Sequence, residues 1–242
     1  MVFAGALTQQ GIQVIAMSRF GYLRTPMPAN SLAAAQADAH VCLLYALGIR
    51  KASVMGGSAG APSALQMATH HPERTSALVP LMPLVPLAYK PLTLADSAPP
   101  PPSWVENALI RSVDSDFLLW VALHVANDLV VKVVLATPPE LLAAANVQEL
   151  SRVETMLEYI LSFFARARGL RSDTAVDKHL TPSPLESIPL PTLVISVRDD
   201  WFGTYVSAQY TAELNAGRFI GTNNGETPTH VILVEMKSEI GV

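Results

Sequence analysis

The sequence is poor in cysteine and in charge, and both shortages limit its function. Cys42 is the single cysteine in 242 residues, so an intrachain disulfide is excluded. Because Cys42 falls on an apolar helical stripe, we expect a packed rather than a reactive thiol. Only 15% of the residues are charged and the formal net charge is −4. No basic cluster occurs, which argues against nucleic acid as a partner.

The sequence also lacks a good membrane span. Residues 117–136 are the longest apolar stretch, but His124, Asp128 and Lys132 interrupt it. The first residues lack the basic segment before an apolar stretch that is typical of a secretory signal. We therefore expect a cytoplasmic protein without a membrane span. Half of the residues are hydrophobic, which is enough for one large α/β domain or a domain with a lid.

A short glycine-rich motif, G-x-S-x-G, is the most informative feature that is present. Gly56, Ser58 and Gly60 occupy its fixed positions. The expected strand 51–55 precedes it and the expected helix 61–69 follows, which is the context of a nucleophile elbow. In such an elbow we expect a Cβ on either side of the serine to clash, and the N–H of Ala59 to face a developing oxyanion.

This motif has two other interpretations. A glycine-rich strand-to-helix turn without chemistry would show the same five residues, although the flanking elements favour the elbow. A phosphate-binding loop fits poorly, because no Gly-Lys-Ser or Gly-Lys-Thr follows the glycines.

The patterns on both sides of the elbow predict alternating strands and helices. We expect strands at 12–17, 51–55, 76–81, 191–197 and 218–220, and helices at 1–10, 32–47, 61–69 and 206–215. Ser31 is expected to cap the helix 32–47. Such alternation is typical of a mostly parallel sheet covered by helices on both faces.

Residues 93–183 show a different pattern, with helical segments and no strands between them. We expect helices at 103–112, at 116–136, from Thr137 onward and at 151–169, after a stretch broken by prolines. Ser151 and Glu154 resemble a capping box at the start of the last helix. We interpret 93–183 as a helical lid inserted into a core formed by 1–92 and 184–242.

The chain presents serine, aspartate and histidine in that order, as Ser58, then Asp199 or Asp200, then His230. Each follows an expected strand, and chemistry in open α/β sheets gathers at the carboxyl ends of strands. A serine hydroxyl needs an imidazole to take its proton and a carboxylate to orient that imidazole. The plainer alternatives are a helix cap for the aspartates and a solvated loop histidine for His230.

The sequence resembles the α/β-hydrolase superfamily, in its esterase and lactonase-like branch with a helical lid. The matching motifs cover nearly the whole chain and lie at residues 18–22, 47–49, 56–60, 71–74 and 192–203, with a late histidine. The resemblance implies an α/β-hydrolase fold with Ser58 as nucleophile and His230 as general base. It favours Asp200 over Asp199 as the acid, and it implies no metal or organic cofactor.

The chain departs from this family in its N-terminal region. Related hydrolases carry a His-Gly loop upstream of their first helix, and this loop supplies a second oxyanion donor. They also carry further strands before that loop. No His-Gly pair occurs here, so the chain looks truncated at its N-terminus. Loss of one oxyanion donor typically lowers kcat about 10²–10³-fold. Missing strands would expose a sheet edge, which predicts a homodimer or poor solubility.

Two functions follow from these observations. The first is a serine hydrolase that cleaves small-molecule carboxylic esters through an acyl-enzyme intermediate; haloperoxidase or perhydrolase chemistry uses the same triad and stays open. The second is a catalytically impaired relic that binds without turnover, which the missing oxyanion loop favours. Gly57 and the lid residues Trp104 and Trp120 are expected to contact a substrate in an apolar pocket.

Overall fold

The computed structural model describes residues 5–85, 116–125, 143–160, 164–177, 184–197, 204–215 and 231–236. The chain divides into two compact units. The sheet unit comprises residues 29–101 and 173–239, and the helical unit comprises 1–28, 102–172 and 240–242. The helical unit thus groups the first 28 residues with most of the expected lid. The expected domain limits, with a core at 1–92 and 184–242 and a lid at 93–183, stay a prediction.

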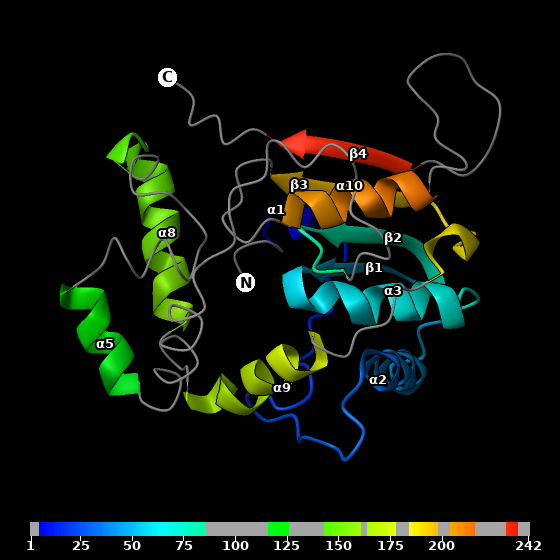
Figure 1. Ribbon diagram of the computed structural model, residues 1–242, viewed down its shortest axis with the longest axis horizontal. Coiled ribbons are helices and arrows are strands. Elements are labelled where there is room, and N and C mark those ends of the chain that lie inside the picture. Colours follow the sequence, from blue (N-terminus) through cyan, green and yellow to red (C-terminus); the bar gives the residue numbers. More distant parts are fainter. Residues whose placement is uncertain are drawn as a thin grey trace. The chain divides into compact units, whose positions relative to one another are not determined.

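A four-stranded parallel sheet organises the sheet unit (Figure 1). Its strands, in spatial and chain order, are β1 (Ala52–Gly57), β2 (Thr75–Leu81), β3 (Thr192–Val197) and β4 (Val231–Met236). Gly57 pairs with Leu81, and Leu81 pairs with Ile195. The carboxyl ends of β1, β2 and β3 therefore meet at one edge of the sheet, and the expectation of a parallel sheet is confirmed.

Two helices cover one face of this sheet, and a third helix packs beside them (Figure 1). The helices are α2 (Ala33–Ala46), α3 (Ala61–His70) and α10 (Thr204–Asn215). Helix α3 packs on β1 and β2, α10 packs on β3 and β4, and α2 packs on α3. The short 3-10 helix η4 (Leu185–Ser187) contributes Leu185 to the core. The core cluster joins α3, β2, η4 and α10 through buried residues that include Leu65, Leu78, Leu185 and Tyr210.

Helix α2 forms a second, smaller apolar cluster with α3. It packs on α3 through Ala37 and Leu44, which contact Met67. Cys42 is exposed. The expectation of a packed thiol was therefore wrong, because the buried face of α2 turns Cys42 away from α3.

The expected strand at residues 12–17 does not form. These residues adopt neither helix nor strand, and Ile12 and Ile15 are 50% and 40% exposed. A strand needs a neighbour to satisfy its backbone N–H and C=O groups. Within the described part of the chain no strand pairs with this segment, and β1 ends the strand order. The strand predicted here from the alternating pattern was therefore wrong.

The helical unit contains α1 (Gly5–Gln9), α5 (Asp116–Val125), α8 (Val147–Ile160), the 3-10 helix η3 (Phe164–Arg166) and the start of α9 (Ala167–Asp177). Asp116 Oδ1 accepts a hydrogen bond from the N–H of Phe164 at 2.8 Å, which ties η3 to α5. Within the described residues, no helix is both long enough and apolar enough to cross a membrane.

The loop around Gly21 packs closely on the start of α9. The N–H of Gly169 donates to the carbonyl of Gly21 at 3.0 Å, and the N–H of Leu23 donates to the carbonyl of Ala165 at 2.8 Å. Gly21 has φ +76°, and a Cβ there would lie 2.8 Å from the nitrogen of Gly169. Gly169 therefore contacts the Gly21 loop from inside α9. The expectation that a helix ends at Gly169 was wrong.

Two expected helix caps were also wrong. The N-cap of α2 is Leu32, not Ser31, and the Leu32 N–H donates to Asn30 Oδ1 at 3.2 Å. Helix α8 begins at Val147, before the expected box at Ser151. Asn146 caps it, because its Oδ1 accepts a hydrogen bond from the N–H of Glu149 at 2.9 Å.

Candidate active site

The strand–turn–helix expected around Ser58 is present in the structure. Strand β1 ends at Gly57, the 3-10 turn η1 spans Ser58–Gly60, and α3 begins at Ala61. Ser58 has φ +48°, in the left-handed region, and its side chain is exposed. A non-glycine residue there costs about 1–3 kcal/mol and persists only where the surroundings enforce it. This strained turn has the geometry of a nucleophile elbow.

The glycines of the motif are required to different degrees. A Cβ on Gly56 would lie 2.6 Å from Ala64 Cβ and 2.8 Å from the carbonyl oxygen of Gly60. Gly56 therefore lets α3 approach the strand. A Cβ on Gly60 would meet nothing within 4 Å, and one on Gly57 would make only ordinary contacts. The clash expected on both sides of the serine therefore occurs at Gly56, before Ser58, and does not occur at Gly60, after it.

The segment after β2 braces the elbow. The N–H of Leu84 donates to the carbonyl of Ser58 at 3.3 Å, and the N–H of Met82 donates to the carbonyl of Ile195 at 2.7 Å. Met82 has φ +44°. The carbonyl of Val85 accepts from Ser207 Oγ at 3.2 Å. Sequence reasoning missed this brace, because the prolines nearby signalled only an extended connection.

Of the expected site residues, the described part of the sheet unit brings together Gly57, Ser58 and Ala59. Ala59 follows the serine in η1 and is partly buried, next to the N-terminus of α3. That helix end carries a positive partial charge, which favours an anion nearby. Among the residues that the structure describes, none donates to or accepts from Ser58 Oγ.

Trp104, Asp199, Asp200 and His230 lie outside the described residues. Strand β3 ends at Val197, at the same edge of the sheet as Gly57. The chain therefore leaves β3 toward Asp199 and Asp200 from the edge that carries Ser58. The role of either carboxylate stays a prediction.

Strand β4 begins at the opposite edge of the sheet from Ser58. Val231 pairs with Thr192 and Met236 pairs with Val197, so β4 begins at the edge of the sheet away from Ser58. His230, the residue before Val231, lies outside the described residues. The role of His230 as general base stays a prediction.

Trp120, expected in the substrate pocket, lies on α5 in the helical unit. It is 48% exposed, and its ring centroid lies 6.2 Å from that of Phe117 and 4.2 Å from that of His124. Its role in substrate binding stays a prediction. No group of three or more His, Cys, Asp or Glu side chains that could hold a metal ion occurs within the described ranges.

Comparison with known proteins agrees with this fold. A family model described as the alpha/beta hydrolase fold matches residues 3–226. No curated protein matches the sequence. An alpha/beta hydrolase fold protein from Nakamurella multipartita superposes with a TM-score of 0.68 at 22% identity, covering 98% of this chain and 78% of its own.

Two further solved structures are similar at lower identity. A carboxylesterase structure from Nitrososphaera gargenis has a TM-score of 0.61 at 15% identity, over 96% of this chain and 74% of its own. An N-acyl homoserine lactone degrading enzyme has a TM-score of 0.54 at 18% identity, over 91% and 73%. The family match over residues 3–226, together with the parallel sheet and the strained elbow, leads to one conclusion: the chain belongs to the alpha/beta hydrolase fold family.

Proposed function

We propose that this hydrolase cleaves small-molecule carboxylic esters with Ser58 as its nucleophile. The observation that supports this is the left-handed backbone of Ser58 at the carboxyl edge of β1, where α3 begins. Ser58 Oγ attacks the ester carbonyl, and the N–H of Ala59 binds the oxyanion. The alcohol leaves and water releases the acid from the acyl-enzyme. His230 is the candidate proton acceptor and Asp200 the candidate acid that orients it.

The direct test is hydrolysis of p-nitrophenyl acetate and butyrate by the 242-residue chain, beside Ser58→Ala. We expect hydrolysis that disappears in the variant, and covalent labelling of the wild-type serine by a fluorophosphonate. Equal rates in two folded proteins, with no labelling, would rule out Ser58 as nucleophile.

The two aspartates are separated by a matched pair of substitutions. We expect Asp200→Asn to lower kcat about 10³–10⁴-fold, as loss of the orienting carboxylate does in serine hydrolases. Asp199→Asn is expected to change kcat less than tenfold. The reverse ranking would assign the role to Asp199. His230→Gln should match Asp200→Asn in effect, and an unchanged kcat would remove His230 from the mechanism.

A second candidate function, binding without turnover, is favoured by the absence of a His-Gly oxyanion loop from the sequence. Without the second oxyanion donor, kcat falls about 10²–10³-fold, and ester hydrolysis by Ser58 approaches the background rate. Wild type and Ser58→Ala would then show the same background rate. A rise in melting temperature with butyrate esters in both proteins would support this function, and no shift in either would exclude it.

An apolar acyl pocket in the helical lid is part of the first proposal. Trp104 and Trp120 are its proposed lining, and the exposed ring of Trp120 is in keeping with a contact residue. We expect kcat/KM to change as the acyl chain grows from two to eight carbons. A flat profile would contradict a defined apolar pocket.

We also propose a homodimer. In its support, β1 ends the described strand order, and Met55 on this strand is 52% exposed. An unpaired sheet edge is a template for pairing with another chain. Sedimentation velocity should give a mass twice that of one chain, which is 25.9 kDa. The mass of a single chain at every concentration of a dilution series would contradict the dimer. The cytoplasmic location stays a prediction.

A further inference from the structure

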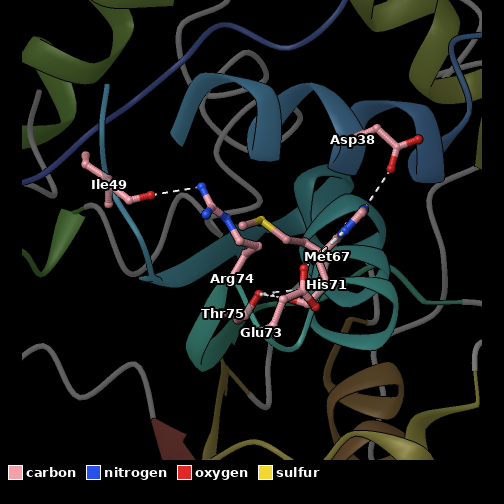
Figure 2. Close-up of polar contacts among 7 residues, drawn as sticks. All are labelled: Asp38, Ile49, Met67, His71, Glu73, Arg74 and Thr75. Atoms are coloured by element: carbon pink, nitrogen blue, oxygen red, sulfur yellow. Dashed lines mark hydrogen bonds and ion pairs between the residues drawn. The ribbon is translucent and has the colours of Figure 1, made fainter. Parts of the chain in front are cut away.

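A polar cluster lies at the end of α3 away from the elbow (Figure 2). It is centred on the turn after α3, within the motif 71–74 that the sequence shares with related hydrolases and that the proposed chemistry does not use. His71 caps the C-terminus of α3, and its N–H donates to the carbonyl of Met67 at 2.9 Å. The side chains of this turn point outward to two neighbouring segments.

His71 joins the turn to α2. Its Nε2 lies 2.7 Å from Asp38 Oδ1, and because a carboxylate only accepts, the imidazole donates this hydrogen bond. Its Nδ1 lies 3.8 Å from Glu73 Oε1. The imidazole side chain is only 24% exposed, whereas Asp38 and Glu73 are 67% and 64% exposed. The ring is thus held between two carboxylates at the junction of α2 and α3.

Arg74 joins the same turn to the segment that enters β1. Its Nη2 donates to the carbonyl of Ile49 at 3.0 Å, and its own carbonyl accepts from the N–H of Ala52, the first residue of β1, at 3.1 Å. Thr75, the first residue of β2, donates its hydroxyl to the carbonyl of His71 at 3.0 Å. One turn of five residues therefore connects α2, α3, β1 and β2 (Figure 2).

We propose that His71 and Arg74 are positioning residues for the nucleophile elbow, acting as a clamp on the far ends of β1 and α3. The inference rests on the proposed role of Ser58. Strand β1 and helix α3 meet at Ser58 and are held together at their other ends by this clamp. At a rise of about 1.5 Å per residue, α3 is a rod about 15 Å long that carries a displacement of one end to the other.

The need for the clamp comes from strain at the elbow. The left-handed backbone of Ser58 persists only while the surrounding structure prevents relaxation. Gly56 and Ala64 hold the helix close to the strand at the elbow end, and the clamp fixes the angle between them at the other end. When the clamp is lost, α3 tilts, the backbone of Ser58 relaxes to negative φ, and its hydroxyl leaves the attacking position.

The test compares His71→Ala and Arg74→Met with matched controls at neighbouring exposed positions, His70→Ala and Arg50→Met. Every variant is assayed well below its melting temperature, where circular dichroism shows it folded. We expect the clamp variants to lower kcat and the rate of fluorophosphonate labelling of Ser58 five- to tenfold, with KM within twofold of wild type. The controls should stay within twofold in all three quantities.

His71→Gln provides a rescue, because its amide places a donor where Nε2 of the imidazole lies. It should restore kcat to within about twofold of wild type. Should Arg74→Met fail to fold, His71→Ala and Asp38→Ala carry the test. Lowered melting temperatures with unchanged kcat and labelling per folded molecule would overturn the proposal, since a merely stabilising turn behaves in that way.

Amide hydrogen exchange of the peptide that spans 56–61 separates the clamp from the chemistry. The clamp predicts at least tenfold faster exchange there in His71→Ala and Arg74→Met, and no change in His70→Ala. This readout needs no activity, so it decides the clamp even if Ser58 proves not to be a nucleophile. Unchanged exchange at the elbow in the two clamp variants overturns the proposal.

Discussion

At Ser58 the chain keeps a backbone conformation that a serine does not favour, with φ +48° between an extended strand and a helix. Glycine adopts this conformation without steric cost. We therefore expect Ser58→Gly to raise the free energy of unfolding by about 1 kcal/mol while removing the nucleophile. Urea unfolding beside Ser58→Ala, which keeps the Cβ, measures the difference. A Ser58→Gly protein less stable than Ser58→Ala would contradict strain at this residue.

Gly56 and Gly60 flank the same serine with different constraints. Gly56→Ala would place its Cβ 2.6 Å from Ala64 Cβ, and overpacking of this kind costs about 1–3 kcal/mol. Gly60→Ala has open space and a helical φ of −85°, so we expect no loss, or a gain of about 0.4–1 kcal/mol. Urea unfolding of both variants is the measurement. Equal losses would show that the whole motif is crowded.

At the scale of single elements, the start of α8 offers a sharp test. Asn146 accepts a hydrogen bond from the N–H of Glu149, whereas Ser151 lies one turn inside the helix. We expect Asn146→Ala to lower the free energy of unfolding by about 1 kcal/mol, as loss of an N-cap does. Ser151→Ala should be within about 0.5 kcal/mol of wild type. A larger loss of unfolding free energy in Ser151→Ala than in Asn146→Ala would indicate that Ser151 is the N-cap after all.

Element boundaries followed from the sequence where several signals agreed. Strand β1 and helix α3 lie within two residues of their expected bounds, since apolar pattern and flanking glycines agreed at β1, and apolar pattern and Pro72 agreed at the end of α3. The segment 12–17 shows the limit of a single signal. Its alternation is that of a strand, but pairing requires a partner elsewhere in the chain, and no local pattern reports whether that partner exists.

At the scale of the whole sheet unit, the core cluster between the helices and the sheet offers a test of the packing. Leu78 on β2 is fully buried and belongs to the cluster that includes α3 and α10. We expect Leu78→Ala to lower the free energy of unfolding by about 2–5 kcal/mol. Leu47→Ala, at a leucine that is 52% exposed, should cost less than about 1 kcal/mol. Chemical denaturation monitored by circular dichroism compares them, and similar losses would contradict this core.

The sequence by itself determined the parallel α/β architecture, the family and the position of Ser58 at a strand-to-helix turn. Those properties depend on local pattern, because periodicity, glycine and proline act over a few residues. Only the tertiary structure decided that residues 12–17 stay unpaired, that Gly60 is uncrowded, that His71 and Arg74 join four elements, and that Val231 starts β4 at the edge away from Ser58. Each of these depends on contacts between residues far apart in the chain, which no local pattern encodes.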